Sequence, residues 1–264
     1  MTKEKKGLWL IRLIAIFTVS IFLFSNKIPQ NIGYHHFSDT KAFISIPNTL
    51  NVLSNLPFLI IGIFALYSLF YKNKTSYNIV NSNKLAYLTF FLGISLVGFG
   101  SSYYHLWPSN NTLVWDRLPM TFAFMGLFSI IIGEYISEKK ARLLLFPLLI
   151  VGILSVLYWW YSESQGSGDL RYYIVVQFFP IITIPIILLF FKSQYNNKLA
   201  YWILLTSYIA AKFFEYFDFE IHQTLIFISG HSIKHIIPCI GIYILLKSYI
   251  KNDFNNHYHL KLEE

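Results

Sequence analysis

The sequence predicts an all-α bundle of helices that span a membrane, and three observations lead to that prediction. The 264 residues are 55% hydrophobic and only 13% charged, whereas soluble domains carry about 25% charged residues. Apolar stretches of about 20 residues, the length that crosses a bilayer, recur along the whole chain. Lys and Arg gather in alternate segments between these stretches. An ordinary soluble globule and a disordered chain are therefore excluded.

Eight stretches are long and apolar enough to be membrane spans. We expect them at roughly 7–25, 53–71, 85–106, 117–136, 142–161, 172–191, 199–217 and 225–249. The first follows several lysines, as the apolar part of a signal peptide does, but the segment after it, 24–27, lacks the small-x-small cleavage pattern. We therefore expect an uncleaved N-terminal transmembrane anchor over 1–30, one compact helical bundle over 31–250 and a cytoplasmic tail over 251–264.

The positions of Lys and Arg predict the orientation, because these residues are retained on the cytoplasmic side of short loops. With a cytoplasmic N-terminus, 14 of the 21 Lys and Arg residues fall on the cytoplasmic side and four on the outer side. The four are Lys27, Lys41, Arg117 and Arg171, while Arg12, Lys212 and Lys234 fall within spans. This asymmetry predicts that both termini are cytoplasmic. It also accounts for the net charge of +8 without a nucleic-acid partner.

Three of the eight histidines fall in or at the ends of spans, where an ionisable residue indicates function. His231 and His235 are four residues apart, which puts both rings on one helix face about one turn apart. His105 ends the third expected span on the outer side, where the eighth span begins. We therefore expect the three imidazoles to meet in the outer half of the bundle. Because His235 lies about ten residues into its expected span, helix tilt or a longer third helix has to bring the rings to one depth.

Three histidines without a cysteine ligand match a catalytic zinc site, which leaves the fourth position to water. The His231–His235 pair taken alone equally fits a haem, a hydrogen-bonded helix contact or a proton path. Two more residues favour a hydrolytic site. Ser101 lies four residues before His105 on the same helix face, and Asp116 opens the fourth expected span, so they supply an oxyanion donor and a general base. Their structural alternatives are a small packing residue and a helix cap.

Other polar residues within the spans have structural interpretations. Lys212 and Glu215 are three residues apart on one helix and are expected to form an ion pair. Lys234 is expected to face away from the histidine pair, either paired or extended towards the interface. Cys239 is the single cysteine, which excludes an intramolecular disulfide and a cysteine-based zinc site.

Four segments together carry a resemblance to a known family. They are Val52-Leu53-Ser54-Asn55-Leu56, Ser101-Ser102-Tyr103-Tyr104-His105, Trp115-Asp116-Arg117-Leu118-Pro119-Met120, and the pair His231 and His235. With these residues in this order and spacing, the chain resembles the alkaline ceramidase and phytoceramidase family over roughly 46–250. That family lies within a wider superfamily of seven-helix membrane hydrolases, which includes the adiponectin receptors and the Per1-type lipid-remodelling proteins.

The resemblance implies a seven-helix catalytic core, to which the span at 7–25 is an addition. The implied zinc ligands are His105, His231 and His235. Asp116 is then expected at the zinc-bound water and Ser101 at the developing oxyanion. The implied activity is zinc-dependent hydrolysis of the amide of a ceramide-like membrane lipid, which releases a fatty acid and a sphingoid base. The alternatives are a receptor-like or lipid-binding protein with a structural metal site, and a hydrolase of another lipid amide or ester.

The chain departs from the animal members of that family ahead of the first core helix. Those proteins carry an acidic calcium-binding segment, with a Glu three residues before the Asn that corresponds to Asn51. This chain has Asn48 at that position and Asp39 as the acidic residue upstream. The expectation of calcium is therefore not carried over, and the resemblance does not fix ceramide itself as the lipid.

Overall fold

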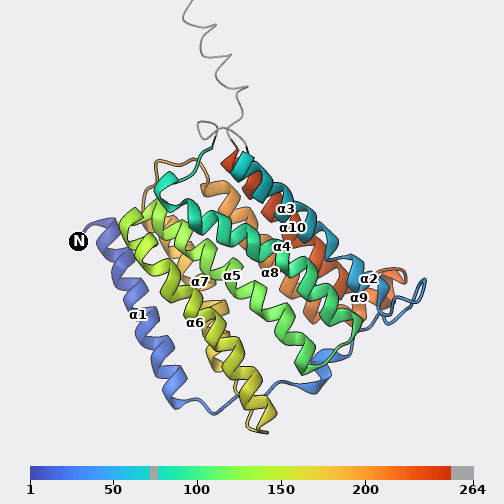
Figure 1. The fold of residues 1–264 in the computed structure, drawn as a ribbon. Helices are drawn as coiled ribbons and strands as arrows, with labels where there is room; N and C mark the ends of the chain where they lie inside the picture. Colours follow the sequence, from blue (N-terminus) through green and yellow to red (C-terminus); the bar gives the residue numbers. More distant parts are fainter. Residues whose placement is uncertain (72–76, 251–264) are drawn as a thin grey trace, which may run out of the picture.

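The computed structural model describes residues 1–71 and 77–250, and the predicted all-α helical bundle is confirmed (Figure 1). The helices are α1 (Lys3–Phe24), α2 (Thr49–Leu53), α3 (Leu56–Tyr71), α4 (Lys84–Leu106), α5 (Asn110–Tyr135), α6 (Glu138–Ser164), α7 (Arg171–Phe190), α8 (Lys198–Tyr216), α9 (Asp218–Leu225) and α10 (Gly230–Tyr249). A short 3-10 helix, η1 (Ile32–His35), lies between α1 and α2, and another, η3 (Asn81–Asn83), precedes α4. The tail expected over 251–264 lies outside the described residues.

Length and composition identify a multi-pass membrane protein. Within the described ranges, six helical segments are long and apolar enough to cross a bilayer, with α2 and α3 counted as one of them. The pair α9 and α10, bent by 99° at its break, makes a seventh candidate if it is one span. Helix α8 is not among the candidates, although it packs along α10. It carries both Lys212 and Glu215 within its apolar stretch.

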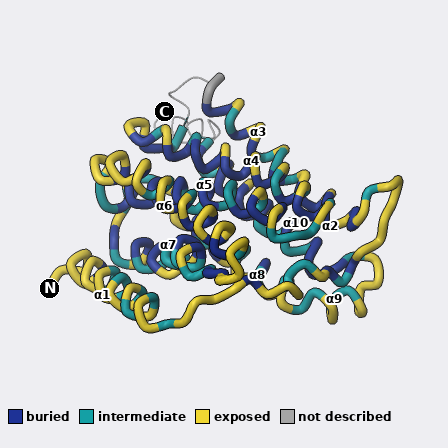
Figure 2. Tube along the Cα trace, turned by 60° about the horizontal axis from the view of Figure 1, so that its bottom comes forward, coloured by how far each residue is buried: buried dark blue, intermediate teal, exposed yellow. Residues whose placement is uncertain are grey.

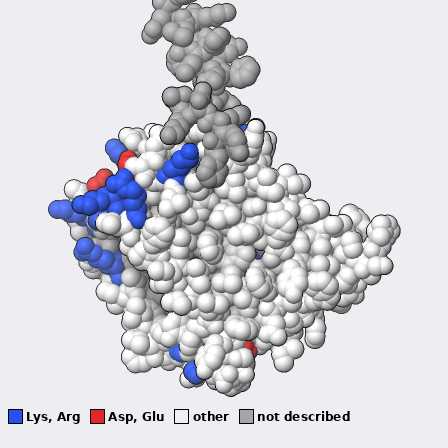
Figure 3. Space-filling view, viewed as in Figure 1, with Lys and Arg blue, Asp and Glu red and all other residues white. Residues whose placement is uncertain are grey.

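The connections between helices alternate between two ends of the bundle (Figure 1). The N-terminus and the turns after α5 and α7 lie at one end, and the connections from α4 to α5 and from α6 to α7 lie at the other. Figure 3 shows Lys and Arg side chains gathered on the first end, while the middle of the visible face is almost free of charge. This distribution agrees with the sequence, in which Lys and Arg gather in alternate segments between the apolar stretches.

Helix α1 lies along the edge of the bundle and is exposed over most of its length (Figures 1 and 2). It packs against α7 at Gly7, where a Cβ atom would lie 2.6 Å from the Cβ of Phe190, so a larger residue does not fit. At the other end of α1, the Arg171 guanidinium donates hydrogen bonds to the carbonyls of Phe22 and Ser25, at 3.1 and 2.6 Å. The helix is therefore held at both ends while it buries little surface.

A buried carboxylate ties the helices together at the end that holds the N-terminus. Glu134, in the last turn of α5, accepts hydrogen bonds from the hydroxyls of Tyr87 and Tyr201 at 2.8 and 2.9 Å. The Asn197 side-chain amide donates a third at 3.1 Å, and the Tyr201 and Tyr249 hydroxyls lie 2.9 Å apart. These contacts join α4, α5, α8 and α10 through polar groups that burial would otherwise leave unsatisfied.

The starts of α5 and α10 differ most from those expected from hydropathy. Helix α5 begins at Asn110, not near 117, because Ser109 caps it and exchanges hydrogen bonds with Thr112. Asp116 therefore lies inside the helix, and the expectation that it opens or caps the fourth span is wrong. Helix α10 begins at Gly230, not near 225, because Ser229 caps it and because α9 ends at Ile226, which has a positive φ of 65°.

Candidate metal centre and adjoining cavity

Three histidines from two helices converge at the end of the bundle opposite the N-terminus. His105 is the penultimate residue of α4, and His231 and His235 lie in the first two turns of α10. One nitrogen from each ring lies within 4.8 Å of the others, and the Nε2 atoms of His105 and His231 are 3.4 Å apart. All three side chains are buried, with exposed fractions of 1–7%. The expected meeting of the imidazoles is confirmed.

The start of α10 explains why His105 and His235 lie at one depth, although their expected spans place them at different depths. Because α10 starts at Gly230, His231 lies in its first turn and His235 in its second. Both histidines are therefore close to the helix end that faces the C-terminal end of α4, where His105 lies. Helix α4 itself ends at Leu106, so no extension of that helix is required.

The first turn of α10 is fixed by two polar residues from distant segments. Ser229 caps the helix, and its hydroxyl and that of Ser232 lie 3.4 and 2.7 Å from the Asn51 Oδ1 atom. The backbone N–H of His231 donates to the Asp218 carboxylate of α9 at 2.7 Å. Because free N–H groups at a helix start need acceptors, these contacts also hold the histidine pair in place.

The surroundings of the rings fit the binding of a transition metal. The Ser54 hydroxyl lies 2.8 Å from His235 Nδ1, which leaves the Nε2 atom of that ring available as a ligand. Phe37 packs over His105 and His231, with ring centroids 4.7 and 4.5 Å away. His105 Nδ1 is buried without a hydrogen-bond partner in the described structure. Three buried histidines that bring one nitrogen each within 4.8 Å of the others form a ligand set of the kind that holds zinc in proteins.

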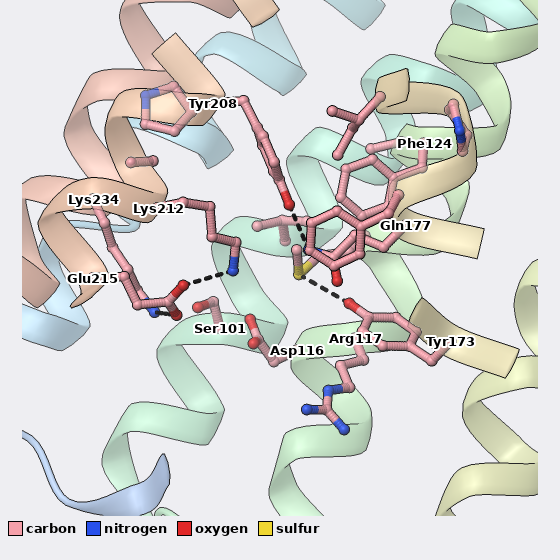
Figure 4. A pocket seen from close by; sticks show the side chains of 18 of the residues that line it. Ser101, Asp116, Arg117, Phe124, Tyr173, Gln177, Tyr208, Lys212, Glu215 and Lys234 are labelled. Atoms are coloured by element: carbon pink, nitrogen blue, oxygen red, sulfur yellow. Dashed lines mark hydrogen bonds and ion pairs between the residues drawn. The ribbon is translucent and has the colours of Figure 1, made fainter. Parts of the chain in front are cut away.

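Ser101 and Asp116 form a second pair beside this centre. Ser101 is one helical turn before His105 on α4, and Asp116 lies two turns into α5. Figure 4 shows both side chains pointing to the same space. Within residues 1–71 and 77–250, the Asp116 carboxylate has no hydrogen bond to the three imidazoles, so it is left to face the cavity.

A cavity of about 460 Å³ connects these groups (Figure 4). Ser101, Asp116 and His235 line one part of it. Much of the remaining wall is apolar and includes Phe90, Ile94, Met120, Phe124 and Ile184. A few convergent polar groups at one side of an apolar cavity are typical of a binding site for a small apolar or amphipathic molecule.

Three charged residues from α8 and α10 add an ion cluster to the cavity wall. Glu215 pairs with Lys212 at 2.6 Å, as the sequence predicts, and with Lys234 at 2.7 Å. The Tyr34 hydroxyl, in η1, donates to the same carboxylate at 3.3 Å. Burial, together with the negative charge of Glu215, raises the pKa of Tyr34, so the phenol stays protonated and can donate. Lys234 therefore lines the cavity beside His235 and is not directed to the membrane surface.

Arg117 is the main site residue that the sequence interpretation missed. Hydropathy placed it in an outer loop, whereas it is 6% exposed inside α5 and lines the cavity. Its guanidinium donates to the Gln30 side-chain oxygen at 2.7 Å and stacks on Trp159. The N-cap signal at Ser109 would have placed the start of the helix correctly and Arg117 inside it.

Comparisons with known proteins bear on the identity of this site. A comparison with curated proteins finds no match for the chain. The family model for Ceramidase matches residues 41–259, which include all three histidines, Ser101 and Asp116. The region of the match covers most of the sequence and begins after α1. The chain that carries this buried histidine centre therefore belongs to the Ceramidase family.

Proposed function

We propose that the protein is a zinc-dependent hydrolase that cleaves the amide bond of a ceramide-like lipid within the membrane. The observation that carries the proposal is the convergence of His105, His231 and His235 beside a cavity that also contains Asp116 and Ser101. A structural metal site needs neither a neighbouring carboxylate nor a cavity, whereas a hydrolytic site needs both. Membership of the Ceramidase family supports the same chemistry.

The three imidazoles are the residues that would hold the ion. When bound there, zinc supplies a Lewis acid that polarises a carbonyl and makes water acidic near neutral pH. The Ser54 hydroxyl contacts the His235 ring, and Asp218 and Asn51 hold the start of α10, which carries both His231 and His235. Such outer contacts orient metal ligands before the metal arrives.

Asp116 is proposed as the group that moves the proton. Its carboxylate takes a proton from the attacking water as the water oxygen bonds to the amide carbon. It then gives that proton to the amide nitrogen as the carbon–nitrogen bond breaks, which yields a carboxylic acid and an amine. The Ser101 hydroxyl donates a hydrogen bond to the oxyanion that develops on the carbonyl oxygen, a contact worth about 3 kcal/mol in other hydrolases.

The cavity suits a lipid that has its reactive amide between polar and apolar parts. The polar side of the wall holds the catalytic groups, and the apolar side can accept hydrocarbon chains without exposing them to water. A site inside the bundle also allows both chains to remain in an apolar environment during the reaction. We further propose that both termini are cytoplasmic and that the histidine centre lies towards the opposite face.

The experiment that tests this function replaces His231 by Ala and measures zinc content and ceramide hydrolysis in the same preparation. Removal of one of three ligands is expected to abolish both the bound zinc and the release of fatty acid. His36→Ala is the matched control, because His36 is exposed in the loop before α2. It is expected to keep wild-type zinc content and turnover.

The same preparation separates the alternatives. Zinc present at one ion per chain with no turnover of ceramide or of a lipid ester would contradict the hydrolase and favour a receptor-like protein with a structural metal site. Turnover that persists in His231→Ala, or in protein stripped of metal by a chelator, would refute the metal-dependent mechanism.

A further inference from the structure

The guanidinium of Arg117 is a buried cation that forms no ion pair within the part of the chain that the structure describes. Its Nη2 atom donates to the Gln30 amide oxygen at 2.7 Å, but the Nη1 atom is buried and has no partner. Among residues 1–71 and 77–250, no carboxylate forms an ion pair with it. A cation buried in this way is costly unless an anion compensates it. A bound anion at this position would therefore offset the cost of burying the guanidinium.

The charges around the cavity do not supply the missing anion. Arg117, Lys212 and Lys234 line it against two carboxylates, Asp116 and Glu215. Glu215 is shared by both lysines, and Asp116 forms no ion pair with Arg117 among the described residues. The cavity wall thus carries an excess of positive charge, and Arg117 is the cation with no carboxylate assigned to it within the described ranges.

The guanidinium is also held in a fixed orientation. It stacks over the Trp159 ring at 4.1 Å and over the Tyr173 ring at 4.9 Å, measured from Cζ to the ring centroids. Aromatic faces on a guanidinium restrict its plane and leave its N–H edges free to bind an oxyanion. A planar donor edge of this kind suits the oxygens of a phosphate, sulfonate or carboxylate.

We propose that the lipid substrate carries an acidic group close to the scissile amide and that Arg117 binds this group, which makes Arg117 a specificity-determining residue. The inference rests on the proposed lipid amidase function. Because Arg117 and Asp116 line the same cavity, one bound lipid can reach both, and the anion is expected on the part of the lipid that carries the amide. In an N-acyl lipid of the ceramide type, the headgroup is attached to the carbon that is two bonds from the amide nitrogen. The ends of the hydrocarbon chains are many bonds away from that nitrogen.

The test compares two lipids that differ only in this group, ceramide and ceramide 1-phosphate with the same chains. We expect wild-type protein to give a higher kcat/KM for the acidic lipid. In Arg117→Gln, the ratio of the two kcat/KM values is expected to fall by about 10- to 100-fold, the effect of losing one hydrogen bond to a charged group. Arg117→Lys keeps the charge but loses the planar edge, and its ratio is expected to lie between those of the wild-type protein and Arg117→Gln. Lys27→Gln removes a positive charge from an exposed loop position and is expected to leave the ratio unchanged.

A binding measurement makes the result independent of turnover and of poor folding in one variant. In Asp116→Asn protein, ceramide 1-phosphate is expected to raise the melting temperature more than ceramide does. Addition of Arg117→Gln, or of Arg117→Lys if the Gln variant does not fold, is expected to remove or reduce that difference. Free palmitate, tested in parallel, distinguishes a substrate headgroup from the carboxylate of the released fatty acid.

The outcomes separate this inference from the proposed function. Hydrolysis of ceramide with no preference for the acidic lipid and no effect of Arg117 on the ratio overturns the inference and leaves the amidase intact. Selective stabilisation by the acidic lipid without hydrolysis of either lipid supports the anion site and contradicts the amidase. Stabilisation by palmitate alone would assign Arg117 to the product and overturn its role in the headgroup.

Discussion

At the scale of single residues, the proposed hydrolysis depends on Asp116 for proton transfer. Its carboxylate faces the cavity beside Ser101, and the histidines lie on the neighbouring helices. A metal ion alone polarises a carbonyl, but proton transfer to the leaving amine needs a positioned side chain. Asp116 and the histidines therefore have separable roles, and variants can distinguish them.

Asp116→Asn keeps the shape of the side chain and removes its ability to accept a proton. We expect kcat to fall by about 10²- to 10⁴-fold while zinc content stays at the wild-type value, in contrast to His231→Ala. Steady-state kinetics and metal analysis of the purified variant provide the measurement. Glu220→Gln makes the same chemical change at an exposed position on α9 and is expected to have no effect. Loss of zinc from Asp116→Asn would show that Asp116 acts as a ligand.

Spacing in the sequence, together with the expected topology of the spans, selected the five residues of the proposed site. The i,i+4 histidine pair and Ser101, four residues before His105, are local patterns that a helix converts directly into shared faces. Contacts between distant segments were not accessible in this way. Arg117 meets Gln30 across 87 residues, and Ser54 meets His235 across 181, so no local pattern indicates either role.

At the scale of helices, the close approach of α4 and α5 brings Ser101 to Asp116. The residues just before them, Gly100 and Trp115, form this contact, because a Cβ atom on Gly100 would collide with the Trp115 carbonyl oxygen. Only glycine allows the two backbones to come so close, as is common between helices in membranes. The pairing of the hydroxyl and the carboxylate therefore depends on a neighbouring residue that has no side chain.

Gly100→Ala is expected to separate α4 from α5 and to disturb the Ser101–Asp116 pair. Displacement of catalytic groups by about 1 Å can lower kcat by about 10²-fold, so we expect a large loss of activity even in the folded fraction. Gly98→Ala is the matched control, since its Cβ would instead meet Leu59 of α3 at 2.7 Å. Both variants are expected to melt at lower temperature. An equal loss of kcat in the two, measured well below their melting temperatures, would contradict a special role for Gly100.

Helix identity was predictable from hydropathy, whereas helix ends were not. The apolar pattern indicated the helices in the correct order, but it placed the start of α5 seven residues late and that of α10 five residues early. In each case, local hydrogen bonding and backbone conformation determined the end, at Ser109 and at Ile226 respectively. A hydropathy window averages over such residues and cannot resolve them.

At the scale of the whole molecule, the two ends of the bundle differ in charge and in chemistry. The end with the N-terminus carries most of the visible Lys and Arg and the buried Glu134 network, while the other end carries the histidine centre (Figures 1 and 3). Positive charge is retained on the cytoplasmic side. The proposed orientation follows from this rule and places the histidine centre towards the opposite leaflet.

Single cysteines report this orientation directly, because the native Cys239 is only 3% exposed. Ser167→Cys lies in the exposed α6–α7 connection and Gln194→Cys in the α7–α8 connection at the other end of the bundle. With a membrane-impermeant maleimide on sealed cells or vesicles of known orientation, we expect labelling of Ser167→Cys from outside. Gln194→Cys is expected to react only after permeabilisation. The reverse pattern would contradict the proposed topology. Labelling of the unaltered protein would show that Cys239 itself reacts with the maleimide.

The segment that follows α1 forms part of the cavity wall through residues 28–31, including Gln30. Its backbone is fastened to the bundle by hydrogen bonds from Gln30 to Glu163 and from Leu170 to Ile28. This segment precedes the region that matches the family, which begins at residue 41. Mutations there can alter which molecules enter without touching any group that breaks a bond. Part of the wall that contacts a bound molecule is thus encoded ahead of the residues proposed for catalysis, and mutations there can change its shape while those residues are preserved.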